Sequence, residues 1–142
     1  MGKYKEKAFS ELEFQFTKRF NFSFFVHELK ASALNQQEEN NLIEKKRIEL
    51  GLNFQQSFLM TEKGKSFDTT ELKNLVQKKS EEFSSLLFII GGSFGFTETT
   101  FKNYSMQLAL SPLTFPHQLA RLILVEQLYR IQTIIQNHPY HH

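Results

Sequence analysis

An unbroken apolar run that opens directly into a glycine-rich turn constrains this chain more than any other stretch. The run, residues 86–90, reads Leu-Leu-Phe-Ile-Ile, and residues 91–95 follow it as Gly-Gly-Ser-Phe-Gly. A short, continuously apolar segment is typical of a strand covered on both faces, as in a parallel sheet. Ligands of α/β proteins usually bind in the loops beyond the carboxyl ends of such strands. Residues 91–95, the glycine loop, are therefore the first candidate for a binding segment.

The rest of the chain alternates between helical and strand periodicities. Helical patterns occur at 4–20, at 39–50, after Asp68, at 97–104 and at 116–136, and strand patterns occur at 22–26, 54–60, 86–90 and 106–110. Segments 31–41, 61–67 and 111–115 are expected to be loops. Asp68 with Glu71 has the spacing of a capping box, and Gly51 is a suitable residue to close the second helix. This alternation predicts an α/β fold with a mainly parallel sheet, in a single domain over residues 1–142.

Composition narrows the class of protein. Seventeen Lys and Arg against fifteen Asp and Glu leave a net charge of +2, so any contact with nucleic acid is expected to depend on a local patch. The chain has no Cys, which excludes disulfides, thiolate zinc sites and cysteine nucleophiles and fits a reducing compartment. The apolar run 86–90 is far shorter than the roughly 20 residues of a membrane helix. We therefore expect a cytoplasmic protein with no membrane partner.

The last predicted helix, 116–136, carries more apolar surface than one sheet face can cover. Its apolar residues are spread around much of its circumference: Leu119, Leu122, Ile123, Val125, Leu128, Ile131, Ile134 and Ile135. A second copy of the chain would cover the remainder. The pattern therefore predicts a homodimer.

The glycine loop also contains the literal pattern Gly-x-Ser-x-Gly after a strand, which is the nucleophile elbow of serine hydrolases. Ser93 would be the nucleophile, and Glu126 and His138 follow in the order that a triad requires. Both partners, however, lie on or just past one helix and not at separate strand ends.

The glycine loop also lacks the Lys-Ser/Thr of a phosphate-binding P-loop. A tight turn that needs glycine for its backbone conformation is an equally good interpretation.

Residues 111–117, Ser-Pro-Leu-Thr-Phe-Pro-His, form a second candidate segment. Two prolines make it stiff, so its backbone groups could bond to an adenine edge, or it could be only a rigid connection. His117 and Arg121 are four residues apart and share one face of the helix that follows. A neutral His117 could accept a proton there, although both residues could equally belong to an exposed polar face.

The C-terminal segment 137–142 is rich in hydrogen-bonding groups and carries Tyr140, His141 and His142. No Asp or Glu accompanies its histidines, and a proline interrupts their spacing. We therefore expect no metal site in this segment.

Several of these segments together resemble one known family, the ribosomal RNA large-subunit pseudouridine N3-methyltransferases (the RlmH family) of the SPOUT superfamily. The resemblance rests on residues 87–95 (LFIIGGSFG), 113–121 (LTFPHQLAR), 126–130 (EQLYR) and 138–141 (HPYH). It is looser before that region, where residues 2–7 and the pair Gly64 and Lys65 are similar to the family's first and middle loops.

The resemblance implies a fold and an activity. The fold would be a SPOUT-type parallel sheet flanked by helices, with a C-terminal trefoil knot over about residues 86–142. The activity would be methylation of N3 of a pseudouridine in helix 69 of 23S ribosomal RNA, with S-adenosyl-L-methionine as cofactor and no metal. A homodimer acting on RNA within the ribosome, and not on DNA, is implied with it.

The resemblance also implies roles for individual residues. The cofactor pocket would be formed by Met60, where the family commonly has Leu, by Gly92, and by Ser111, Pro112, Leu113, Thr114, Phe115 and Pro116. His117, Arg121, Tyr140 and His141 match family positions near the transferred methyl group and the RNA. His117 or His141 would remove the N3 proton, and Tyr140 would stack on or orient the base.

The sequence departs from the family pattern at two places. The family's first strand precedes its Gly-Lys loop, whereas this chain begins with Met1, Gly2 and Lys3, so that strand is expected to be missing from the sheet. The family's basic residue near the end is His142 here, which weakens one expected phosphate contact at neutral pH.

Three functions remain open at this point: the ribosomal RNA methyltransferase, a serine hydrolase that uses Ser93, and a non-catalytic RNA-binding ribosome factor.

Overall fold

A three-stranded parallel sheet forms the centre of the computed structural model, which describes residues 6–30 and 35–140. Its strands are β1 (Ser57–Ser66), β2 (Leu87–Ile90) and β3 (Gln107–Ala109), in the order β2-β1-β3. The central strand pairs with β2 from Ser57 opposite Leu87 to Met60 opposite Ile90. The predicted α/β class and parallel sheet are confirmed.

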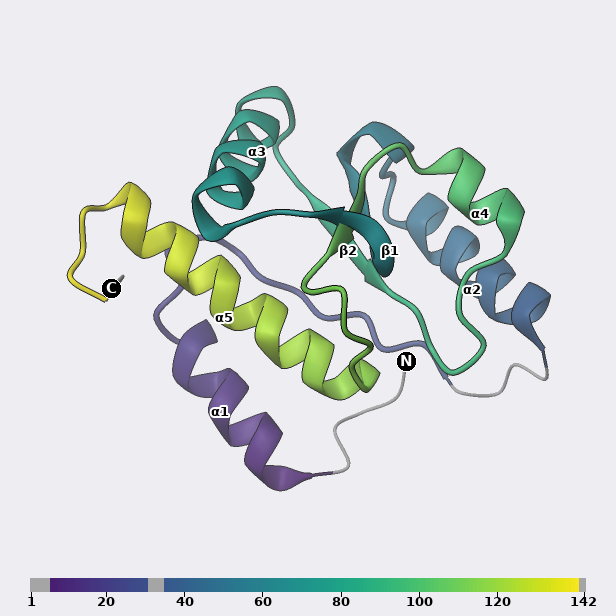
Figure 1. Cartoon of the computed structure of the whole chain (residues 1–142), viewed down its shortest axis with the longest axis horizontal. Helices are drawn as coiled ribbons and strands as arrows, with labels where there is room; N and C mark the ends of the chain where they lie inside the picture. The colour runs from purple at the N-terminus through teal and green to yellow at the C-terminus, as the bar shows by residue number, and fades with distance from the viewer. Residues whose placement is uncertain (1–5, 31–34, 141–142) are drawn as a thin grey trace.

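Helices cover both faces of this sheet (Figure 1). One face carries α3 (Thr69–Glu82) and α5 (His117–Ile135), with α1 (Lys7–Thr17) packed on the outer side of α5. The other face carries α2 (Gln36–Glu49) and α4 (Glu98–Asn103). The chain therefore has three layers, with the sheet in the middle.

Each layer boundary holds its own hydrophobic core because successive side chains of a strand point to opposite faces. Phe58 and Met60 of β1 pack in the core below α3 and α5 with Leu72, Leu124 and Leu128. Leu59, between them in sequence, packs on the other side with Ile43 of α2 and with Ile89, Phe96 and Tyr104. Phe58 is fully buried, and its ring stacks on that of Phe88 with centroids 4.8 Å apart. Burial on both faces is why β1 begins with a continuous run of buried residues.

Helix ends follow local rules that the sequence predicts. The Asp68 carboxylate accepts a hydrogen bond from the Glu71 N–H, and the Glu71 side chain accepts one from the Asp68 N–H, which completes the capping box of α3. Gly51 follows α2 with φ of +69°, the left-handed conformation that glycine adopts without steric cost. Asn35 caps α2, which therefore begins at Gln36, three residues before the predicted stretch 39–50.

The predicted strand at 22–26 is wrong. This segment is neither helix nor strand, although Phe22 and Phe24 pack against the ring of Phe20. Its start is instead tied to α5, because Gln132 accepts a hydrogen bond from the Asn21 N–H and donates one to the Arg19 carbonyl. Only Phe24 of this segment packs, partly buried, against the core that includes α5, and Phe22, Phe25 and Val26 stay exposed.

The predicted loop at 61–67 is also wrong, because β1 continues to Ser66. Its pairing with β3 shifts register between Met60 and Lys65, so the strand bulges where the loop was expected. Gly64 lies against the neighbouring backbone, where a Cβ atom would come 2.6 Å from the carbonyl carbon of Gln107. The glycine that suggested a loop therefore permits close approach of two strands.

None of the helices in the described part of the chain combines the length and apolar character that a membrane crossing requires.

Candidate functional site

A cavity of about 490 Å³ opens at the carboxyl ends of β2 and β3, beside the middle of β1. Its walls come from residues 60–63 of β1, from the glycine loop after β2, from most of residues 110–116 after β3 and from the first turn of α5. Gln36 of α2 and Phe101 of α4 complete it. Parallel strands end at one edge of a sheet, and this is where α/β proteins usually bind ligands.

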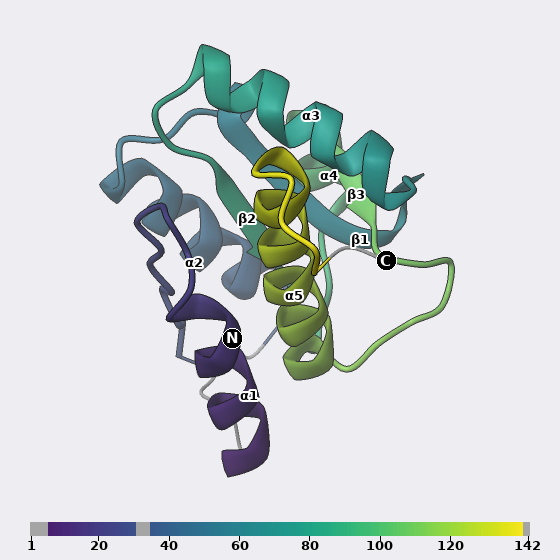
Figure 2. The same ribbon diagram turned by 90° about the vertical axis from the view of Figure 1, so that its left-hand side faces the viewer.

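The cavity brings together most of the residues that the sequence assigned to a cofactor. Met60, Gly92, Ser111, Leu113, Thr114, Phe115 and Pro116 all line it, whereas Pro112 does not. Residues 111–116, the proline loop, extend away from the sheet before the chain returns to α5 (Figure 2). Within this loop the Ser111 hydroxyl accepts a hydrogen bond from the Leu113 N–H at 3.1 Å, and Leu113 is 69% exposed.

Glycine is favoured at two positions of the glycine loop for different reasons. Gly95 has φ of +70°, which side chains with a Cβ rarely adopt. Gly92 is instead constrained by space, because a Cβ atom there would come 2.7 Å from Oε1 of Glu39. The loop therefore keeps its shape through one left-handed glycine and one close contact with α2.

Three side chains of α2 hold the glycine loop and its continuation to Thr97, and we call Gln36, Glu39 and Asn40 the α2 clamp. Glu39 accepts from the Gly92 N–H at 2.6 Å. Gln36 donates to the carbonyls of Phe94 and Phe96 at 3.0 and 3.2 Å. Asn40 donates to the Gly95 carbonyl at 2.9 Å and accepts from the Thr97 N–H at 3.0 Å.

Sequence reasoning missed the α2 clamp. Part of it fell in the expected loop 31–41, and the rest appeared only as the start of a charged helix. The one available signal was spacing: Gln36, Glu39 and Asn40 are three and four residues apart, so they share one face of a helix. Nothing in that spacing identified the glycine loop as their partner.

His117 lines the cavity as the first residue of α5, immediately after Pro116. Arg121 lies one turn further along α5, and its guanidinium donates to both carboxylate oxygens of Glu13 at 2.8 and 2.6 Å. It also donates to Glu28 at 2.9 Å. In this chain Arg121 therefore joins α5 to α1 and to the segment that follows α1.

Tyr140 packs against the middle of α5, away from His117. Its hydroxyl donates to Glu126 at 3.1 Å, and its ring packs edge-on against Tyr129 with centroids 4.8 Å apart. Burial, followed by the charge of Glu126, raises the pKa of Tyr140. Glu126 also accepts a hydrogen bond from the Arg130 guanidinium, and this bond is the main reason that the pKa of Arg130 is raised. His141, the remaining predicted catalytic residue, lies outside the described residues.

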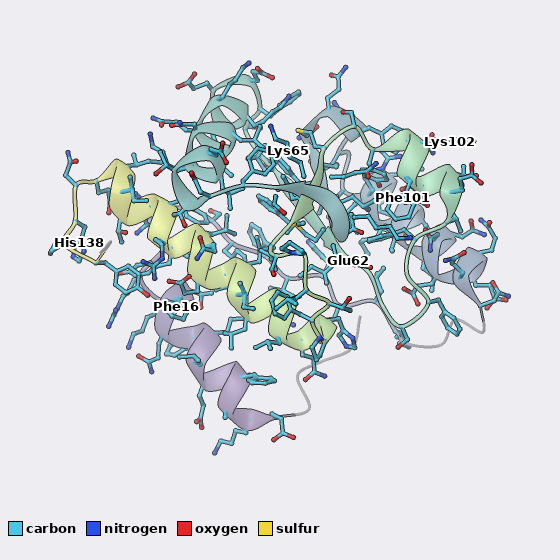
Figure 3. All side chains as sticks on the ribbon, viewed as in Figure 1. Phe16, Glu62, Lys65, Phe101, Lys102 and His138 are labelled. Atoms are coloured by element: carbon cyan, nitrogen blue, oxygen red, sulfur yellow. The ribbon has the colours of Figure 1, made fainter. Side chains whose placement is uncertain are left out.

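The hydrolase triad does not assemble within the described chain. Ser93 lines the cavity, but the Glu126 carboxylate is engaged by Arg130 and Tyr140. Figure 3 shows His138 on the opposite side of the molecule from Glu62 and Phe101, which line the cavity. A nucleophilic serine needs its base within hydrogen-bonding distance, so this geometry does not support a serine hydrolase.

The described residues contain no group of three His, Cys, Asp or Glu side chains placed to share a metal ion.

Comparison with known proteins gives a consistent result. A family model described as "Predicted SPOUT methyltransferase" matches residues 1–141. A protein of Parabacteroides distasonis named "Ribosomal RNA large subunit methyltransferase H" is 44% identical over 85 residues, which are 59% of this chain and 54% of that protein. Proteins of the same name from Phocaeicola vulgatus and Prochlorococcus marinus are 45% identical over 85 residues and 46% identical over 86 residues.

The match covers 59% of this chain in both cases, and 54% and 58% of these two proteins. The chain thus spans little more than half the length of the curated relatives it matches.

Proposed function

The chain belongs to the SPOUT methyltransferase family, and on that premise we propose that it methylates N3 of a pseudouridine in helix 69 of 23S ribosomal RNA, with S-adenosylmethionine as methyl donor. The observation that carries this proposal is the cavity at the strand ends. The resemblance assigned residues from three separate segments to a cofactor pocket. All of these residues except Pro112 line one continuous space.

The cavity fits a cofactor of this size and chemistry. Its volume of about 490 Å³ falls within the roughly 300–1,000 Å³ of typical small-molecule sites. Met60, Ile90 and Leu108 supply apolar wall, and Ser111 and Thr114 supply hydroxyl groups beside it. S-adenosylmethionine supplies an activated methyl group on a sulfonium centre. The proline loop would bind its adenine edge through backbone groups, and Gly92 would contribute backbone surface to the pocket wall.

His117 is the candidate to accept the N3 proton, because it is the one predicted catalytic residue that lines the described cavity. General bases of this kind contribute roughly 10²–10⁴-fold to rate when correctly placed. Arg121 would act indirectly, since its contacts with Glu13 and Glu28 hold α1 beside the helix that begins with His117.

A homodimer would bring Tyr140 and His141 to a cavity. Within one chain Tyr140 packs against Glu126 and Tyr129 in the middle of α5, whereas His117 is the first residue of that helix, so we propose that a second copy supplies the C-terminal segment to each cavity. We propose that α5 forms the dimer interface, in line with its broad apolar surface. We also propose that residues 86–142 form the trefoil knot of the family, within a single domain over 1–142.

The mouth of the cavity suits an unpaired RNA base. Phe94, 45% exposed, and Leu113, 69% exposed, both line the cavity and present apolar surface to solvent. RNA is recognised largely through unstacked bases that pack on such side chains. A net charge of +2 favours a substrate held by shape within the ribosome, where the charges of two subunits act together. The protein would then work in the cytoplasm.

The test is calorimetric binding of S-adenosylmethionine, followed by methyl transfer from labelled cofactor to ribosomes that lack the modification. We expect saturable binding and transfer, and a loss of about 10²–10⁴-fold in rate for His117→Ala with cofactor affinity retained. His27→Ala is the matched control, because His27 is exposed and does not line the cavity.

Other outcomes would redirect the proposal. Undiminished turnover in His117→Ala would remove His117 from the role of base. Cofactor binding without any methyl transfer would indicate a non-catalytic RNA-binding factor, and labelling of Ser93 by a fluorophosphonate would indicate a hydrolase.

A further inference from the structure

We propose that the α2 clamp positions the glycine loop, and that residue 92 is a glycine because the Glu39 carboxylate occupies the space that a side chain would take. Glu39 and Asn40 would then be positioning residues, acting on the cofactor through the backbone of the glycine loop, whereas Gln36 also lines the cavity itself. This inference rests on the proposed function and deepens it by naming what sets the shape of the cofactor site.

The Glu39 carboxylate accepts hydrogen bonds from two backbone N–H groups of the glycine loop. Its Oε1 accepts from the Gly92 N–H at 2.6 Å, and its Oε2 accepts from the Phe94 N–H at 3.4 Å. Hydrogen bonds to an ionised carboxylate are shorter and stronger than those between neutral groups. The loop therefore already binds an anion from its own chain, and a ligand carboxylate or phosphate would have to compete for these donors.

Asn40 fixes the second half of the loop from a buried position. It is 2% exposed, and its amide donates to the carbonyls of Gln36 and Gly95 at 2.8 and 2.9 Å. Its oxygen accepts from the Thr97 N–H at 3.0 Å and from the Thr100 hydroxyl at 2.6 Å. The side chain thus uses both donors and both acceptor positions, and it ties the left-handed Gly95 to the start of α4.

The helix that carries the clamp is itself anchored at its other end. Arg47 donates to Glu44 at 2.8 Å and to the Leu52 carbonyl at 2.7 Å. Glu44 in turn accepts from the hydroxyl of Tyr104, which is almost fully buried at the end of α4. The clamp therefore connects the glycine loop to a rigid element, as precise ligand positioning requires.

Loss of the clamp should weaken cofactor binding more than it slows the chemical step. A loop that must order itself on binding reduces affinity by the free energy of that ordering. The N–H groups of Gly92 and Phe94 would also lose their acceptor. We expect Glu39→Ala and Asn40→Ala to raise both the dissociation constant and the KM for S-adenosylmethionine about tenfold or more, while kcat at saturating cofactor changes much less.

Matched controls come from the same helix. Asn41→Ala removes an exposed amide that accepts a hydrogen bond from Gln37, and Glu49→Ala removes an exposed carboxylate paired with Lys46. Both should leave cofactor affinity within about twofold of the unmodified chain. Glu39→Gln should retain much of the affinity, because its amide oxygen still accepts from Gly92. Equal losses in the clamp variants and the controls would overturn the inference.

A double-mutant cycle tests the claim about Gly92. In the unmodified chain Gly92→Ala places a methyl group 2.7 Å from Oε1 of Glu39, and cofactor affinity should fall. In the Glu39→Ala background that obstacle is gone, so adding Gly92→Ala should cost less than about a further twofold. If the two losses multiply instead, the cofactor itself requires the glycine and the proposed coupling is wrong.

Amide hydrogen exchange separates this inference from the proposed function. In the free protein, Glu39→Ala should speed exchange at Gly92 and Phe94 while the amides of β1 keep their protection. Unchanged exchange at these two amides would overturn the clamp even if the cofactor binds. Absence of cofactor binding to the unmodified chain, with exchange altered as expected, would instead contradict the proposed function and leave the clamp as the determinant of loop shape.

Discussion

Replacing Arg121 by methionine should destabilise the chain by breaking a nearly buried ion pair. The Arg121 and Glu13 side chains are 14% and 12% exposed, and two hydrogen bonds of 2.6 and 2.8 Å join them. Methionine keeps much of the aliphatic volume of arginine but leaves the Glu13 carboxylate without this cation. The change therefore isolates the loss of charge pairing from the loss of packing.

The burial of the pair sets the magnitude. Removing one partner of a fully buried pair costs roughly 3–5 kcal/mol, whereas an exposed pair contributes about 0–1 kcal/mol. The pair formed by Arg121 and Glu13 lies close to the buried limit, while Glu28 is 27% exposed. We expect Arg121→Met to lower the free energy of unfolding by about 2–4 kcal/mol.

A double-mutant cycle measured by urea unfolding checks this reasoning. Glu13→Met alone should also destabilise, but the double variant should cost no more than Arg121→Met, because neither charge then remains buried without the other. Additive losses would refute the account, since they would mean that the two side chains contribute independently. Lys7→Met is a suitable control, because its partner Glu11 is well exposed and the pair should contribute little.

Three further predictions concern the sheet and α4. Gly64→Ala should lower the free energy of unfolding by about 1–3 kcal/mol, because its methyl group would press on the backbone of Gln107; thermal unfolding measures this. Phe58→Ala should cost about 3–5 kcal/mol in the same assay, because it empties a fully buried site between the sheet and its helices. Burial and the hydrogen bond to Glu44 raise the pKa of Tyr104. The contribution of Tyr104 to the free energy of unfolding is therefore intact below the pKa of about 10 that tyrosine has in the unfolded chain, and it falls as pH rises beyond that value. Tyr104→Phe should therefore flatten the alkaline decline of the urea midpoint.

The sequence predicted those elements whose signals are local. The capping box at Asp68, the left-handed Gly51 and the apolar run at 86–90 each depend on neighbours within a few residues, and each was found as expected. The position of the glycine loop at a strand end followed from a general rule of parallel sheets. Met60 and residues 111–116 were grouped with Gly92 in advance only because the resemblance to the RlmH family implied it.

Features that depend on distant partners could not be read from the sequence. The segment 22–26 has the alternation of a strand, but Gln132 of α5 fixes the backbone just before it and no strand forms. Glu39 looked like one charge among several, yet its partner Gly92 is 53 positions away. Arg121 and Glu13 are 108 positions apart. Spacing along the chain carries no information about such pairs.

A ligand in the cavity would touch all three strands or the loops that follow them, the first turn of α5 and, through Gln36, the layer on the other side of the sheet. Binding would therefore stabilise several elements of the fold at once, not a single loop. The melting temperature of the protein would rise with ligand concentration. At a hundred times the dissociation constant the gain is about 2.7 kcal/mol. Thermal-shift screening of small molecules thus becomes a direct way to learn what the cavity accepts, independent of any assay of catalysis.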